Sequence, residues 1–215
     1  MTPATPAFSV CVYCGSRAGV DAAYAEAARA TGQWIGSHGG QLVYGGGRNG
    51  LMGIVAQATQ EAGGRVVGII PKALVDKEQA NHHCDELHVV DTMHERKAMM
   101  AERSDAFVAL PGGIGTFEEL FEVWTWRQLG YHDKPIGLLN VAGYYDALVV
   151  LLRRSVQSGF MGEWRMGLLP RGAVCRAARA TYDGQALLDR SAAARKALRG
   201  EIAGLSAASR LGKLS

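Results

Sequence analysis

Short apolar runs alternate along the chain with longer segments in which apolar residues recur at helical spacing. The runs at residues 8–13, 41–44, 66–70, 86–90, 106–110 and 136–139 predict β-strands. The longer segments predict helices at 21–37, 50–62, 91–104, 116–129 and 144–158. Strands that alternate with helices pair in parallel, with helices packed on both faces of the sheet. The pattern therefore predicts an α/β fold, a doubly wound Rossmann-like parallel sheet with helices on both faces.

The pattern weakens after Pro170. Residues 173–178 are a candidate last strand and residues 183–198 a candidate last helix. We expect a single Rossmann-like domain over residues 1–190, followed by a basic, Ala-rich tail at 191–215. The tail holds five basic residues and one acid, so its net charge is +4. Because the whole chain has a net charge of +3, residues 1–190 have a net charge of −1. The basic character belongs to the tail, and the body gives no indication of a nucleic-acid partner.

The sequence also bears on compartment and on metal or redox chemistry. No apolar run is long enough to span a bilayer, and residues 1–7 lack the features of a signal peptide, so we expect a cytoplasmic protein with no membrane partner. Cys11 and Cys14 form a C-x-x-C motif, but no second pair accompanies it and it ends a predicted strand. The run His-His-Cys-Asp at 82–85 resembles a metal cluster, yet adjacent side chains of an extended segment point in opposite directions. We therefore expect no metal site.

Glycine-rich stretches follow the predicted strands at three places, 14–17, 45–50 and 111–116. Such stretches let backbone N–H groups approach an anion, and the carboxyl ends of parallel strands meet at one edge of the sheet. We interpret the three as a phosphate or nucleotide site, the alternative being structural turns. Gly45, Gly47 and Gly50 match G-x-G-x-x-G, but the next strand ends without the acid that a dinucleotide site requires. A Walker Lys-Ser/Thr is also absent, so a mononucleotide is favoured.

Charged residues near these stretches have two possible roles each. Thr116 and Glu119 fit a T-x-x-E capping box, so Glu119 either caps a helix or faces a bound ligand. If Asp91 caps the helix at 91–104, Arg96 and Lys97 lie near its positive end, where cations are unfavourable. The two cations either pair with nearby acids such as Glu95 or bind a phosphate or a developing negative charge.

The helix predicted at 116–129 has two apolar stripes. One consists of Phe117, Leu120, Phe121 and Trp124, and the other of Val123, Trp126 and Gly130. One stripe is sufficient to cover a sheet, so the second predicts a partner surface.

The sequence Pro-Gly-Gly-Ile-Gly-Thr-Phe-Glu-Glu at 111–119 resembles the PGGxGTxxE signature of the LOG (Lonely Guy) proteins. These are cytokinin riboside 5′-monophosphate phosphoribohydrolases, often mislabelled as lysine decarboxylases. The resemblance covers roughly residues 8–160. Its further motifs, in family order, are Cys14-Gly15-Ser16, Gly45-Gly46-Gly47, Gly50-Leu51-Met52-Gly53, Met93-x-x-Arg96-Lys97, Trp126-x-Gln128-Leu129-Gly130 and the stretch 134–140.

The resemblance implies hydrolysis of the N-glycosidic bond of adenosine 5′-monophosphate (AMP), plain or N6-modified. The products are the free base, a cytokinin or adenine, and ribose 5-phosphate. It implies Arg96 and Glu119 as the catalytic pair, a homodimer, and no metal or organic cofactor. With the glycine stretches it predicts these substrate contacts: Gly15, Ser16, Gly45, Gly46, Gly47, Glu78, Met93, Arg96, Lys97, Gly112, Gly113, Ile114, Gly115, Thr116 and Glu119.

The residue types suit this chemistry. A carboxylate such as Glu119 stabilises an oxocarbenium-like sugar or orients the attacking water, while Arg96 neutralises charge on the departing base or on the phosphate. The alternative is a non-catalytic carrier of a nucleotide or of molybdenum cofactor, which needs no carboxylate at a sugar. A pyridoxal-dependent decarboxylase is not expected, because no lysine of the body lies in a recognisable pyridoxal context.

Overall fold

The computed structural model describes residues 5–163. The candidate elements at 173–178 and 183–198, the boundary near residue 190 and the basic tail lie outside the described residues. The strands are β1 Ser9–Tyr13, β2 Gln41–Tyr44, β3 Arg65–Pro71, β4 Glu86–Val90, β5 Ala106–Ala109 and β6 Ile136–Leu138. The helices are α1 Ala22–Ser37, α2 Gly50–Glu61, α3 Met93–Glu102, α4 Ile114–Gln128 and α5 Asp146–Gln157, with short 3-10 turns η1 Lys72–Leu74 and η2 Val141–Gly143. Each strand and helix predicted within this range is confirmed, whereas the two 3-10 turns were not predicted.

The six strands form one parallel sheet in the order β4-β3-β2-β1-β5-β6. The order runs outward from β1 in both directions, so the chain winds toward one edge through β4 and then returns to the centre to add β5 and β6. Residue Val10 of β1 pairs with Ala106 of β5 across this central junction. The prediction of a doubly wound sheet is confirmed.

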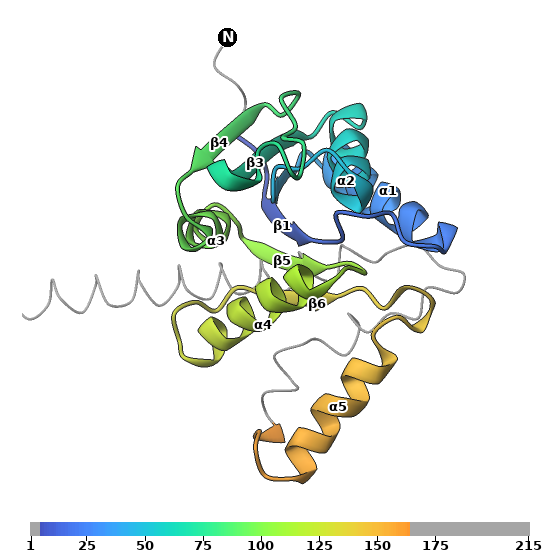
Figure 1. The fold of residues 1–215 in the computed structure, drawn as a ribbon, viewed down its shortest axis with the longest axis vertical. Coiled ribbons are helices and arrows are strands. Elements are labelled where there is room, and N and C mark those ends of the chain that lie inside the picture. The colour runs from blue at the N-terminus through green and yellow to red at the C-terminus, as the bar shows by residue number, and fades with distance from the viewer. Residues whose placement is uncertain (1–4, 164–215) are drawn as a thin grey trace, which may run out of the picture. The chain divides into compact units, whose positions relative to one another are not determined.

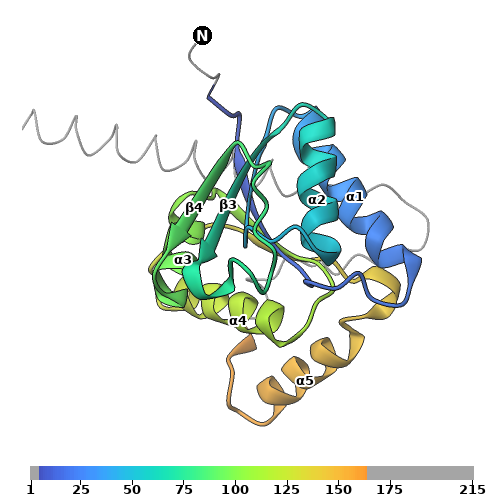
Figure 2. The ribbon, with the colours of Figure 1, turned by 45° about the horizontal axis from the view of Figure 1, so that its top comes forward.

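Helices cover both faces of the sheet (Figures 1 and 2). The pair α1 and α2 lies side by side on one face, and α3 and α4 lie on the other. Strands β1, β2 and β5 are buried along their whole length, as expected for strands between two helical layers. Strand β4 is the partly exposed edge, where Val89 is 54% exposed.

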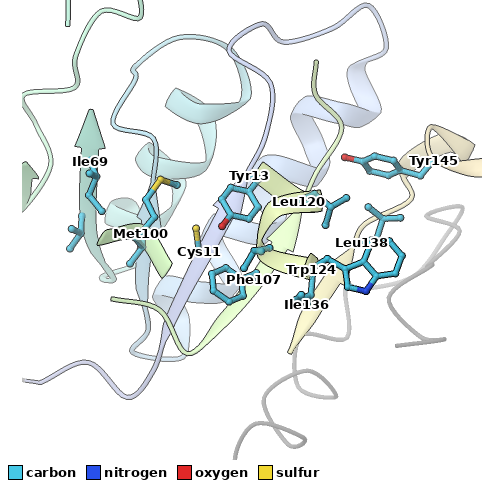
Figure 3. Close-up of a cluster of buried hydrophobic side chains, with 14 of the residues drawn as sticks. Cys11, Tyr13, Ile69, Met100, Phe107, Leu120, Trp124, Ile136, Leu138 and Tyr145 are labelled. Carbon is cyan, nitrogen blue, oxygen red and sulfur yellow. The ribbon is translucent and has the colours of Figure 1, made fainter. Parts of the chain in front are cut away.

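The core on the α3–α4 side is continuous from β3 to β6. Figure 3 shows Tyr13 and Phe107 from the central strands between Met100 of α3 and Leu120 of α4. The rings of Tyr13 and Phe107 lie nearly parallel, with centroids 6.1 Å apart. This packing fixes the positions of α3 and α4 relative to the carboxyl ends of β1 and β5.

Two predictions about these helices need correction. Helix α3 is capped by Thr92, which accepts from the Glu95 nitrogen while the Glu95 carboxylate accepts from the Thr92 nitrogen, so Asp91 is not the cap. In α4 the buried residues are Thr116, Leu120, Val123 and Trp124. Phe121, from the first predicted stripe, is 37% exposed, whereas Val123, from the second stripe, is buried. The helix is rotated about its axis relative to the predicted stripe.

Candidate active site

A pocket of about 620 Å³ opens at the carboxyl ends of β1 and β5. Because the strand order reverses at this point, the connections after β1 and β5 leave in opposite directions and a crevice remains between them. The loops at 14–19 and 111–116 form much of the lining. The other lining residues are Tyr24, Leu51, Met52, Leu74, Glu78, Met93, Arg96, Glu118, Glu119 and Tyr144.

The first and third glycine stretches pack directly against each other. The nitrogen of Gly15 donates to the carbonyl of Pro111 at 3.1 Å. A Cβ on Gly112 would lie 2.1 Å from the Thr116 hydroxyl oxygen and 2.8 Å from the Gly15 nitrogen, so only glycine fits there. The N–H of Gly15 therefore joins the two loops and is already engaged by a protein carbonyl. Gly15 and Ser16 both line the pocket.

The third stretch places the beginning of α4 at the pocket. The N-cap residue is Gly113, which has no side chain to accept a hydrogen bond from the first turn of the helix. The first-turn N–H groups of Ile114, Gly115 and Thr116 have no partner within the helix, and all three residues line the pocket. A helix N-terminus of this kind attracts a phosphate. The capping-box interpretation of Thr116 and Glu119 is wrong, because the helix begins two residues before Thr116.

The second glycine stretch contacts a pocket residue but does not itself line the pocket. The carbonyl of Gly45 accepts a hydrogen bond from Arg96 Nη2 at 2.9 Å, and a Cβ on Gly45 would lie 1.9 Å from that nitrogen. Gly45, Gly46 and Gly47 are not among the residues that line the pocket. The structure thus brings this stretch to the site as a support for Arg96, where the sequence predicted a contact with the nucleotide.

Arg96 lies in the first turn of α3 with only 4% of its surface exposed. Besides the Gly45 carbonyl, its Nη2 faces Glu78 Oε2 at 3.5 Å. Its Nε is buried and has no hydrogen-bond partner among the described residues. A buried cation near the positive end of a helix, with a donor unsatisfied beside a pocket, is suited to receive an anionic group of a ligand.

Lys97 is placed differently from its neighbour. Its Nζ donates to Glu118 Oε1 at 2.5 Å and to Glu122 Oε1 at 3.0 Å, and it is not among the lining residues. Burial lowers the pKa of Lys97, but the two carboxylates together raise it above its ordinary value. The sequence predicted a substrate contact for Lys97, whereas the ammonium group faces two carboxylates of α4. Lys97 therefore joins α3 to α4. Of the two roles considered for it, pairing with acids is the one observed, but its partners are Glu118 and Glu122 and not Glu95.

Glu119 lies in the second turn of α4 and is partly buried at the pocket. Burial raises the pKa of its carboxyl to about 7, and the nearby negative charges of Glu118 and Glu78 act in the same direction. The positive charges of Arg96 and Lys97 oppose this rise. A carboxyl group with a pKa near neutrality, beside a buried arginine in a pocket, has the properties of a catalytic acid or base.

Two tyrosines of the pocket were not predicted. The rings of Tyr24 and Tyr144 meet edge to face, with centroids 5.7 Å apart. The hydroxyl of Tyr144 donates to the Gly112 carbonyl and so steadies the third glycine stretch. Leu51, Met52 and Leu74 add apolar surface to the lining. Tyrosines 120 positions apart, each in a short connection or a first turn, follow no spacing that could have identified them.

The cysteine and histidine motifs have structural surroundings. Burial raises the pKa of both the Cys11 and the Cys14 thiols, which disfavours the reactive thiolate. Cys84 lies beside the Tyr44 hydroxyl, and Asp85 accepts from the Val66 nitrogen at 2.8 Å. Within residues 5–163 no three His, Cys, Asp or Glu side chains are grouped so as to hold a metal ion. In the same range, no helix has both the length and the hydropathy needed to cross a bilayer.

The fold and the pocket define a doubly wound α/β protein with a crevice suited to a phosphorylated ligand. Comparison with known proteins narrows this class. The family model described as "Possible lysine decarboxylase" matches residues 52–178. LOGL1 of Oryza sativa subsp. japonica, a probable cytokinin riboside 5′-monophosphate phosphoribohydrolase, is 54% identical over 152 residues, which are 71% of this chain and 68% of that protein. LOG5 of Arabidopsis thaliana, a cytokinin riboside 5′-monophosphate phosphoribohydrolase, is also 54% identical over 152 residues, 71% of this chain and 67% of its own length. The chain belongs to the LOG family.

Solved structures show the same architecture. The molybdenum cofactor carrier protein of Chlamydomonas reinhardtii is similar with a TM-score of 0.62 at 21% identity, over 88% of this chain and 99% of that chain. The molybdenum cofactor binding protein of Rippkaea orientalis gives a TM-score of 0.53 at 22% identity, over 74% of this chain and 88% of that chain. At this identity the likeness supports the fold alone.

Proposed function

We propose that the protein hydrolyses the N-glycosidic bond of adenosine 5′-monophosphate or its N6-substituted derivatives. The products are the free base, adenine or a cytokinin, and ribose 5-phosphate. The observation that carries the proposal is the pairing of a raised-pKa carboxyl, Glu119, with the buried Arg96 beside the amino end of α4. The names of relatives at 54% identity support the same reaction.

From the positions of these groups we infer a role for each part of the pocket. The free N–H groups at the start of α4 bind the 5′-phosphate, and this anchors the ribose one helical turn further along, beside Glu119. As the bond to the base breaks, positive charge develops on the sugar, and the Glu119 carboxylate stabilises it or orients the attacking water. The unsatisfied Nε of Arg96 binds negative charge on the departing base or on the phosphate. Tyr24, Tyr144 and the apolar lining supply surfaces on which a flat base packs.

Two other functions are less well supported. A carrier of a nucleotide or of molybdenum cofactor would use the same crevice, but it has no need of a raised-pKa carboxyl beside a buried arginine. A lysine decarboxylase would form a Schiff base between pyridoxal phosphate and a lysine. No lysine is among the pocket-lining residues in the described part of the chain, and Lys97 is engaged with Glu118 and Glu122.

Product analysis with matched substrates tests the proposal. Purified protein is incubated with AMP, N6-isopentenyl-AMP, adenosine and a pyrimidine monophosphate, and the released base and ribose 5-phosphate are measured by chromatography. We expect both adenine nucleotides to be cleaved at least about 100-fold faster than adenosine, because the phosphate anchors the sugar. Equal rates for AMP and adenosine would refute the phosphate-anchored site, and tight AMP binding without any released base would favour a carrier.

We also propose that the protein is a homodimer in the cytoplasm. Leu129 and Tyr131, at the end of α4, are 60% and 76% exposed, and Phe121 on the same helix is 37% exposed. Exposed apolar side chains on α4 and directly after it fit a partner surface. Light scattering at micromolar concentration tests the assembly, and a fully active monomer would contradict it. The cytoplasmic location rests on the free thiols of Cys11, Cys14 and Cys84.

A further inference from the structure

The segment that connects β3 to β4 carries two pocket residues. Residues 72–81, which we call the strap, begin with η1 and bring Leu74 and Glu78 to the pocket. Immediately after Glu78, Gln79 adopts a left-handed backbone with φ of 50°, which costs a non-glycine residue about 1 kcal/mol or more. Such a conformation persists only where the surroundings hold it.

The second glycine stretch holds the strap. The Arg48 nitrogen donates to the Gln79 carbonyl at 3.0 Å, and the Arg48 Nε donates to the Gln79 side chain at 2.9 Å. Gly47 and Ala80 form an antiparallel bridge. The Asn81 nitrogen donates to the Gly46 carbonyl at 2.8 Å. These bonds connect the stretch after β2 with the three residues that directly follow Glu78.

Asn81 is the buried end of this attachment, with 7% of its surface exposed. Its amide nitrogen donates to the Tyr44 hydroxyl at 3.0 Å, and its amide oxygen accepts from the His83 nitrogen at 3.1 Å. Tyr44 is the last residue of β2 and is fully buried. The strap is thus tied through Asn81 to a rigid strand of the central sheet. A buried amide that loses such a partner is left unsatisfied, at a cost well above that of an exposed hydrogen bond.

We propose that Asn81 and Tyr44 are positioning residues that hold Glu78 beside Arg96, and that the second glycine stretch is the dock for the strap. Glu78 Oε2 lies 3.5 Å from Arg96 Nη2, the same nitrogen that donates a hydrogen bond to the Gly45 carbonyl. The second glycine stretch therefore supports Arg96 in two ways, directly through the Gly45 carbonyl and indirectly by holding the strap that carries Glu78. The catalytic consequence rests on the proposed hydrolysis, whereas the docking of the strap does not.

The substitution Tyr44→Phe removes one hydroxyl and leaves the ring in place. We expect the backbone amides of Ala80 and Asn81 to exchange with solvent at least about 5-fold faster, because the Asn81 amide loses its anchor. We expect kcat/KM for AMP to fall about 5-fold to 10-fold as Glu78 loses its place beside Arg96. Thr59→Val is the matched control. It removes a fully buried hydroxyl that bonds the Val55 carbonyl within α2, away from the pocket, and should change neither quantity selectively.

A double-mutant cycle with Glu78→Gln separates positioning from a general loss of stability. If Tyr44 acts through Glu78, Tyr44→Phe lowers kcat/KM by less than about 2-fold once Glu78 is already changed. If the two effects on kcat/KM simply multiply, Tyr44 is a structural residue and the proposal is wrong. An unchanged exchange rate in the strap would also overturn it, even in a protein that released no base and so failed the test of hydrolysis.

A second variant covers the case in which Tyr44→Phe does not fold. A Cβ on Gly47 would lie 2.6 Å from the flexible Met52 methyl group and 3.2 Å from the Glu78 carbonyl oxygen. Gly47→Ala therefore shifts the strap by a few tenths of an ångström from the dock side. We expect the same faster exchange in the strap and the same loss of its kinetic effect when combined with Glu78→Gln. A Gly47→Ala protein with normal exchange and normal kcat/KM would refute the role of the dock.

Discussion

Replacing Glu119 by glutamine should make the protein more stable and much less active. The pKa of Glu119 rises from 4.5 to about 7 on folding, chiefly because burial disfavours the charged form. Since each pKa unit is worth about 1.4 kcal/mol, the ionised carboxylate costs the folded state on the order of 3 kcal/mol above neutral pH. Glutamine keeps the shape without the charge but still buries an amide. We therefore expect a net stabilisation of about 1–2 kcal/mol at pH 8.

The sign of this effect depends on pH. Below pH 4.5 the carboxyl is protonated in both the folded and the unfolded chain, so the wild type pays no penalty and the variant gains nothing. Between pH 4.5 and 7 the unfolded chain ionises first, and the advantage of the variant grows until the folded carboxyl has also ionised. Urea unfolding of Glu119→Gln and of the wild type at pH 4.5, 6 and 8 measures the difference directly.

Activity should change in the opposite direction. The proposed role needs a negative charge at Glu119, so Glu119→Gln should lower kcat for AMP by about 100-fold or more, or about 2.7 kcal/mol in the barrier, with AMP affinity retained. Glu26→Gln, an exposed change on α1, is the control and should alter neither quantity. Glu118 is not a neutral control, because it binds Lys97. A variant with near-normal turnover, or one with no gain in stability at pH 8, would refute the reasoning.

Further predictions concern the neighbours of Glu119. Arg96→Ala should lower kcat/KM by more than about 100-fold, and Arg96→Lys should recover little of it, because one ammonium cannot replace both the Nη2 that meets Gly45 and Glu78 and the separate Nε that is left for a ligand; steady-state kinetics on both variants decides this. The wild-type kcat/KM should fall about tenfold per pH unit below pH 7 as Glu119 is protonated, and a flat profile from pH 5 to 8 would contradict it. Lys97→Met should shift that midpoint to higher pH, since Lys97 lowers the pKa of Glu119, and should destabilise the fold by only about 1 kcal/mol, because Glu118 and Glu122 are partly exposed to solvent. Tyr144→Phe should raise KM for AMP about 2-fold to 3-fold with kcat unchanged, because only the bond to the Gly112 carbonyl is lost.

The sequence was sufficient to predict the order of the strands and helices and to place two of the three glycine stretches at the pocket. The strand run at 41–44 agrees with the structure at both ends, because buried parallel strands are short apolar segments that stand out from their flanks. The stretches at 14–17 and 111–116 also follow from topology, since they end β1 and β5, the strands that flank the reversal of the sheet order.

What the sequence could not supply was the choice between partners that are distant along the chain. Arg96 and Lys97 are neighbours, yet one faces the pocket and the other binds α4, because adjacent positions on a helix differ by about 100° in direction. The stretch at 45–50 resembles a phosphate loop but ends β2, one strand away from the reversal, and so lies behind Arg96. The capping box at Thr116 also failed, because the start of α4 is set by Gly113 and the close packing of Gly112.

The pairing of β1 with β5 has a consequence for the order in which the site is completed during synthesis. The nitrogen of Ser9 donates to the Asp105 carboxylate, a separation of 96 residues, and the two pocket loops directly follow the strands that this contact joins. A nascent chain that has emerged only as far as β4 can pair β1 with β2, β2 with β3 and β3 with β4, but it has only half of the crevice. Nucleotide binding is therefore delayed until α4 has left the ribosome. From then on the nucleotide stabilises the newly closed sheet, because it binds the folded chain and not the unfolded one.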